Sequence, residues 1–413
     1  MTMLLGLLLL STGLPAVAHA QDPPVDGPID LVGELDGAPF EIRVPADWNG
    51  TLVAYAHGYR DRADHPGEVD DRSADAFVGD PFEEVLLAAG FALAGSAYHR
   101  NGWAVKEGIH DTNRLVRHFK AVVGRPDTTI LVGFSMGSVI TFEAIERFAR
   151  LYDGAIPSCA VGSGAPRAFD GTMAISAAYD ATFGWPAAWG TPGDVRDDID
   201  FESEVLPVLL AELSAPGGQA KLEFMRRATG VPEGPEWPFS PMFFSTEGRA
   251  ELERRAHGPV VQNLDHTYAL TDADRAAIEA LGATGEEIDG WLAALDAERA
   301  SAPRRSRNYV IRYADYTGRL RRPVLTLHTV VDALVPPAHI DRYNQTVAEA
   351  GRSEHVVNAW TAGVGHCNFT PTQALTAVTA MQAWIDTGAA PDPASFPSEE
   401  GFVPFTPPPW PQP

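Results

Sequence analysis

A serine flanked by glycines joins two segments of contrasting pattern. Gly133, Ser135 and Gly137 form a Gly-x-Ser-x-Gly sequence. The aliphatic and β-branched run 128–132 before it is typical of a buried strand. Apolar residues at helical spacing follow over 139–148, and Gly154 is predicted to end this helix. A serine at the apex of a strand–turn–helix is presented as a nucleophile, and glycines on either side avoid clashes with neighbouring segments. We therefore predict that Ser135 is a nucleophile held in a strained turn.

Two downstream residues could activate this serine, since a hydroxyl needs a base and the base needs an acid to orient it. His366 lies in a glycine-flanked loop after the predicted strand 355–360, and Asp332 follows the predicted strand 323–328. Both loops leave the carboxyl ends of strands, which is the sheet edge where Ser135 is expected. The order serine, aspartate, histidine predicts a triad. Asp170, beyond a predicted strand over 158–162, is the alternative acid.

Acyl transfer through a serine also needs backbone donors where the oxyanion develops. The N–H of Met136 follows the nucleophile directly, at a helix N-terminus. The second donor is expected after the predicted strand 52–56, where His57, Gly58 and Tyr59 stand in sequence. We predict that the N–H of Tyr59 completes the oxyanion hole and that His57 has a structural role.

The elements that must position these residues alternate between strands and helices over about 30–165 and again over 323–388. This alternation predicts an α/β fold with a mostly parallel central sheet and helices on both faces. Asp36 and Gly37 separate two alternating segments and predict a hairpin at its start. Thr370, Pro371 and Gln373 predict the start of the last helix, which Gly388 ends.

Between these two parts the pattern changes, because 166–322 has no convincing strand. Two capping-box sequences, at Thr271 and Thr284, indicate short helices, so a helical cap is predicted. Large aromatic residues in and near this cap are candidates for the substrate pocket, namely Trp103, Trp185, Trp189 and Phe243. The predicted organisation is a signal peptide (1–20), a first core part (21–165), the cap (166–322), a second core part (323–390) and a proline-rich tail (391–413).

The N-terminal segment has the pattern of a secretion signal. A short apolar run precedes an Ala-x-Ala cleavage sequence at 18–20, although no lysine or arginine comes before that run. We predict a secreted or periplasmic protein. The net charge of −24 argues against nucleic acid and anionic membranes as partners, and no later run reaches transmembrane length.

Cys159 and Cys367 are the chain's two cysteines. Export permits a disulfide, but their spacing does not decide whether they meet. The sequence contains neither a His-Glu-x-x-His pattern nor a cluster of cysteine and histidine ligands. No metal or organic cofactor is therefore expected.

These features resemble the α/β-hydrolases of the esterase and lipase type, over about 30–165 and 323–388. The resemblance places Ser135, Asp332 and His366 on the family's triad, and Tyr59 and Met136 on its oxyanion hole. Cys367 beside the histidine is also similar to tannases and feruloyl esterases, in which a disulfide joins the neighbours of the serine and the histidine. Here phenylalanine, not cysteine, precedes the serine.

The function that this sequence predicts is hydrolysis of carboxylic esters through an acyl-enzyme, on an apolar or aromatic substrate. A peptidase of the proline-iminopeptidase kind is the alternative enzyme, and it would use acidic cap residues to hold an amine. An inactive binding module on the same scaffold is the alternative from another class. Such a module would lack a member of the triad, whereas all three residue types are present.

Overall fold

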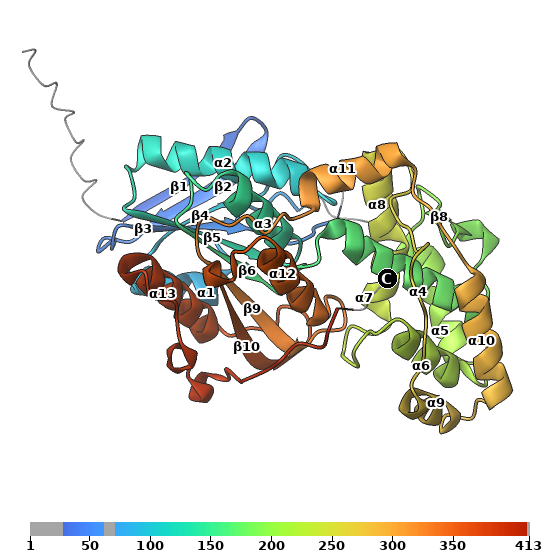
Figure 1. The fold of residues 1–413 in the computed structure, drawn as a ribbon. Coiled ribbons are helices and arrows are strands. Elements are labelled where there is room, and N and C mark those ends of the chain that lie inside the picture. Colours follow the sequence, from blue (N-terminus) through green and yellow to red (C-terminus); the bar gives the residue numbers. More distant parts are fainter. Residues whose placement is uncertain (1–27, 62–70, 411–413) are drawn as a thin grey trace, which may run out of the picture.

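An eight-stranded sheet forms the centre of the molecule. The computed structural model describes residues 28–61 and 71–410, so the predicted signal peptide lies outside the described residues. The strand order is β1-β2-β4-β3-β5-β6-β9-β10 (Figure 1). The strands are β1 Ile29–Leu35, β2 Ala38–Val44, β3 Thr51–Ala56, β4 Ala92–Ser96, β5 Thr128–Phe134, β6 Gly154–Ser158, β9 Val324–Val331 and β10 Val356–Val364.

Most of this sheet is parallel, as predicted. The predicted hairpin is confirmed, because β1 and β2 pair antiparallel across a turn at Asp36 and Gly37. Strand β2 also pairs antiparallel with β4, and the remaining neighbours are parallel. The carboxyl ends of β3, β5, β6, β9 and β10 therefore meet at one edge.

Helices cover both faces of the sheet because its central strands are apolar on both sides. In β5, Leu131 belongs to the core under α2 (Val105–Val122), α3 (Met136–Arg147) and α12 (Ala338–Glu349). Its neighbour Val132 belongs to the core under α1 (Asp80–Ala88) and α13 (Pro371–Thr387). This alternation follows from the two-residue period of a strand and explains why β5 is buried at every position.

A helical insertion separates β6 from β9 and lies beside one end of the sheet (Figure 1). Both predicted capping boxes are confirmed, at Thr271 and at Thr284. The expectation of no strand was wrong for one short ribbon, β7 Gly190–Thr191 with β8 Asp194–Val195. The helices are α4 Ala165–Phe183, α5 Leu206–Ser214, α6 Gly218–Ala228, α7 Phe239–Ser245, α8 Glu247–Ala256, α9 Asp272–Glu279, α10 Gly285–Ala297 and α11 Arg304–Ala314.

The predicted strand over 158–162 was wrong, since β6 is Gly154–Ser158. The helix before it ends at Arg147 instead of reaching Gly154. Gly154 packs closely against α13, since a Cβ there would lie 2.5 Å from Sδ of Met381. Gly154, which was predicted to end a helix, therefore lies in a strand and allows close packing of α13.

The described part of the proline-rich tail is bound to the rest of the protein. Backbone N–H groups of Ala362 and Val403 bond the tail and β10 together, at 2.9 Å in each case. The tail then reaches α12, where the N–H of Trp410 donates to Oδ2 of Asp341 at 2.7 Å. In the part of the chain that the structure describes, no helix combines the length and apolar character needed to cross a bilayer.

Candidate active site

The turn between β5 and α3 has the strained geometry predicted for the nucleophile. Ser135 has φ 57° and ψ −121°, in a region that side chains rarely adopt. A Cβ at Gly133 would lie 2.1 Å from the carbonyl oxygen of Gly137, and a Cβ at Gly137 would lie 2.0 Å from that of Ala56. Both glycines are therefore required sterically, and the turn presents the serine at the carboxyl edge of the sheet.

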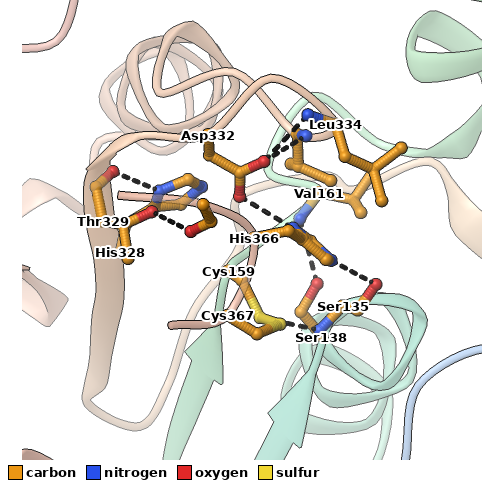
Figure 2. Close-up of a disulfide and its surroundings, with 12 residues drawn as sticks. Ser135, Ser138, Cys159, Val161, His328, Thr329, Asp332, Leu334, His366 and Cys367 are labelled. Carbon is orange, nitrogen blue, oxygen red and sulfur yellow. Dashed lines mark hydrogen bonds and ion pairs between the residues drawn. A yellow bond between two sulfur atoms is a disulfide. The ribbon is translucent and has the colours of Figure 1, made fainter. Parts of the chain in front are cut away.

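The structure brings the three predicted triad residues together (Figure 2). Nε2 of His366 lies 2.8 Å from Oγ of Ser135, and its Nδ1 lies 2.7 Å from Oδ2 of Asp332. Because the carboxylate can only accept, Nδ1 carries the proton and Nε2 is left to accept from the serine hydroxyl. A hydroxyl, an imidazole and a carboxylate thus stand in one chain of hydrogen bonds.

Asp332, the carboxylate in this chain of hydrogen bonds, is buried and ionised. Asp332 has 0% exposure, and its Oδ1 accepts the backbone N–H groups of Leu334 at 3.0 Å and Val335 at 2.7 Å. Burial by itself raises the pKa of Asp332, but His366 and these donors outweigh it and hold the pKa below its usual value. For His366, burial lowers the pKa, yet the charge and hydrogen bond of Asp332 give a net increase.

The alternative acid was wrong. Both carboxylate oxygens of Asp170, in α4, bind the guanidinium of Arg307 at 2.7 and 2.6 Å. Oδ1 also accepts the N–H of Gln262 at 2.9 Å. Asp170 therefore ties helices of the insertion together and does not orient His366.

A disulfide joins Cys159, directly after β6, to Cys367, directly after His366, with their Cα atoms 5.0 Å apart. The sequence left this bond open. The backbone N–H of Ser135 approaches Sγ of Cys159 at 3.2 Å (Figure 2). The same N–H donates to the carbonyl oxygen of Ser158 at 3.1 Å. The sulfur atoms of Cys159 and Cys367 lie close to the imidazole of His366. Because these two sulfur atoms are bonded to each other, they offer no pair of thiolates to a metal.

The loop after β3 lies against the serine. A Cβ at Gly58 would be 3.4 Å from Cβ of Ser135, so Tyr59 follows a close approach of two backbones. His57 is 4% exposed, and its Nδ1–H donates to the Gly58 carbonyl at 2.7 Å. Its ring stacks on Tyr98 at 3.9 Å. Burial, then the charge of Arg60, lower the pKa of His57 to about 3, which makes it a neutral support of this loop.

A small apolar pocket of about 70 Å³ opens at Ser135, with Tyr59 and Met136 in its wall. Trp103 also lines it, as predicted, and packs edge-on against Phe169 of α4 at 4.8 Å. Beside it lies a larger cavity of about 780 Å³. The two share five residues, Ala168, Thr172, Phe244, Leu334 and His339, so the pocket at Ser135 opens toward the insertion.

Three predicted pocket residues do not line this pocket in the described part of the chain. Trp185 and Trp189 pack edge-on at 5.3 Å within the insertion, where Trp189 is buried against Tyr179. Phe243 packs against Tyr59, and it is the next residue, Phe244, that reaches the pocket. Aromatic composition identifies none of these orientations. For Phe243 and Phe244, the rotation of α7 decides which ring faces the serine.

Comparisons with known proteins give one curated relative and several solved structures. No protein-family profile matches the chain. An o-phthalyl amidase of Xanthobacter agilis is 25% identical, over 87% of this chain and 88% of that protein. An esterase of Pyrococcus furiosus is 13% identical with a TM-score of 0.38, covering 90% of this chain and 93% of that one. Feruloyl esterase B of Aspergillus oryzae is 13% identical with a TM-score of 0.42, covering 88% and 81%.

The fold assignment follows from the chain's own topology. A hairpin leads into a mostly parallel sheet, and a helical insertion follows the strand after the serine helix. The serine stands on a strained strand-to-helix turn, with an aspartate and a histidine following in that order. This chain has the α/β-hydrolase fold.

Proposed function

We propose that this protein is a serine hydrolase that cleaves carboxylic esters through an acyl-enzyme. The observation that carries the proposal is the unbroken chain of hydrogen bonds from Asp332 through His366 to Ser135. Each contact is within 3 Å and needs no movement to transfer a proton. A binding module would not need this alignment at a strained turn.

In the proposed reaction, Oγ of Ser135 attacks the substrate carbonyl while Nε2 of His366 takes its proton. The tetrahedral intermediate collapses, and His366 returns the proton to the leaving oxygen. Water then attacks the acyl-enzyme, with His366 again acting as base, and releases the acid. Asp332 holds the imidazole and stabilises its cationic form, consistent with the raised pKa of His366.

The oxyanion hole is part of this proposal. The N–H groups of Tyr59 and Met136 are its donors, because both residues line the pocket at Ser135 and Gly58 brings the first loop close. Donors fixed on backbone need no reorganisation as negative charge develops. The apolar wall formed by Trp103 and Phe169 favours an apolar or aromatic acyl group next to the serine.

Amide hydrolysis is the second candidate, and the similarity to an o-phthalyl amidase over most of both chains favours it. The same triad serves both bonds, since His366 can protonate a leaving nitrogen as well as an oxygen. The aromatic acyl group in that relative's name also agrees with the aromatic pocket wall here.

A peptidase that holds a substrate amine has less support. No carboxylate is among the described residues that line the pocket at Ser135. Glu251, an acidic cap residue whose charge acts on Tyr59, is held by Arg254 and Arg255. Its negative charge is therefore already compensated within the protein.

The test compares matched pairs of substrates that differ only in the bond. One pair is phenyl acetate and acetanilide. The other pair is the phenyl ester and the anilide of the same aromatic acid. The ratio of rates within each pair measures the preference for an ester over an amide bond. Ser135→Ala should lower turnover by at least about 10⁴-fold and abolish labelling by a fluorophosphonate. Ser214→Ala, which changes an exposed serine of α5, is the matched control. Full activity in Ser135→Ala would refute the proposal.

We also infer export of the protein. The signal-like sequence before Gln21 and the disulfide between Cys159 and Cys367 both suit an oxidising compartment. Mass spectrometry of protein recovered from the natural host should find an N-terminus near residue 21. Recovery of the full-length chain from the reducing cytoplasm would contradict this inference.

A further inference from the structure

A carboxylate from the insertion contacts both of the loops that carry the acid and the base. Glu236 lies between α6 and α7, about a hundred residues before Asp332 in the sequence. Its Oε1 accepts the backbone N–H of His366 at 2.6 Å. Its Oε2 faces the backbone N–H of Ala333, the residue after Asp332, at 3.4 Å. One side chain thus bridges the backbones of the two loops.

Two glycines leave space for the side chain of Glu236 beside the loops. Gly365, directly before His366, has φ +106°, and a Cβ there would lie 2.7 Å from Oε1 of Glu236. On the other side, Gly234 lies close to Ala333, since a Cβ on the glycine would be 3.1 Å from Cβ of the alanine. Larger residues at either glycine would push Glu236 away from the loops.

The two loops are also hydrogen-bonded to each other where they leave the sheet. The N–H of Gly365 donates to the carbonyl of Val331 at 2.8 Å, and Oγ1 of Thr329 donates to the carbonyl of Gly365 at 3.0 Å. Glu236 adds hydrogen bonds from the insertion to both loops. It therefore connects the position of the insertion with the distance between the imidazole and its acid.

The charge of Glu236 also acts on His366. Among the described residues, the charged and titratable groups that act on this imidazole are Asp332, Glu236 and His328. Burial lowers the pKa of His328, so it stays neutral. Burial likewise lowers the pKa of His366, but Asp332 and then Glu236 raise it. Glu236 is therefore a second anion that favours the imidazolium.

We propose that Glu236 is a positioning residue, which holds the acid and base loops in register through their backbone N–H groups and makes turnover depend on the docked insertion. This inference rests on the proposed function of Ser135 as nucleophile. Glu236 does not touch the reacting atoms and acts through His366.

Two substitutions separate its contacts from its charge. In Glu236→Ala both contacts are lost, so kcat should fall between about 10-fold and 100-fold with KM nearly unchanged, because small misplacements of catalytic groups are costly. In Glu236→Gln an acceptor remains but the charge is removed. The pKa of His366 should then fall, and the acid limb of the kcat/KM profile should move to lower pH. Glu233→Gln, at an exposed position three residues earlier, is the control.

The decisive measurement combines steady-state kinetics with an NMR titration of His366 in the intact protein. A lower pKa in Glu236→Gln, with the control unchanged, supports the proposal and needs no substrate. Wild-type kcat and an unchanged titration in both Glu236 variants would overturn it. Failure of the wild type to hydrolyse esters or amides would refute the proposed function alone, because the titration still reports the contact. Thermal melting shows whether Glu236→Ala is folded. If it is unfolded, the kinetics and the titration of Glu236→Gln test the proposal.

Discussion

Cys367 is covalently bonded to Cys159, and this bond links the loop of His366 to the backbone beside Ser135. Cys159 follows β6, the strand next to the serine strand, and both cysteines have positive φ, 41° and 55°. His366 is held from the sheet by one covalent bond and from the insertion by one carboxylate.

Removing this disulfide should weaken both stability and catalysis. We expect Cys159→Ala/Cys367→Ala to lower the free energy of unfolding by about 2–5 kcal/mol, as for other native disulfides. Turnover should fall as well, because the loop of His366 loses its covalent link to residue 159, beside Ser135. Guanidinium unfolding and steady-state kinetics measure the two effects. Reductant should inhibit the wild type without affecting the double variant, and equal sensitivity of both would contradict this role.

The pH dependence of activity should reflect the raised pKa of His366. The reaction requires the neutral imidazole, so kcat/KM should fall as pH decreases through this pKa. Because Asp332 and Glu236 outweigh burial, the midpoint should lie above the ordinary histidine value of about 6.5. This midpoint is measured from kcat/KM as a function of pH, in a series of buffers that do not react with the substrate. A midpoint below the ordinary value would show that burial dominates.

Gly137, two residues after Ser135, should tolerate no side chain. In Gly137→Ala the new Cβ would lie 2.0 Å from the carbonyl of Ala56, which is backbone and cannot rotate away. We expect a loss of at least about 1–3 kcal/mol in unfolding free energy and a severe loss of turnover. Gly171→Ala is the control, because a Cβ in this part of α4 meets nothing within 4 Å. That change should leave stability equal or increase it by up to about 1 kcal/mol. Equal behaviour of the two variants would contradict the steric argument.

What the sequence could predict was local. The Gly-x-Ser-x-Gly turn, the hairpin at Asp36 and the capping boxes each depend on a few adjacent residues, and each has the predicted geometry. The positions of Asp332 and His366 followed from strand order, because parallel strands end at one edge. These inferences needed no knowledge of which side chains pack together.

What the sequence could not predict depended on packing between distant segments. Gly154 reads as a helix stop, yet it is a packing position under α13. The pairing of Cys159 with Cys367 required the positions of two loops separated by 208 residues. Glu236 carried no signal at all, because one glutamate in a turn-rich segment gains its role only where it meets the histidine loop.

The C-terminal tail should influence the size of substrate that the enzyme accepts. The ring of Trp410 packs edge-on against His339 at 4.9 Å, and both residues line the larger cavity. His339 also lines the pocket at Ser135, so the tail borders a continuous space that leads to the serine. In Trp410→Ala we expect KM for esters with bulky aromatic groups to change several-fold, whereas phenyl acetate should be unaffected. A substrate series measures the split, with Trp410→Phe as the conservative control. The same change for small and large esters would show that Trp410 acts on the fold as a whole and not on the cavity.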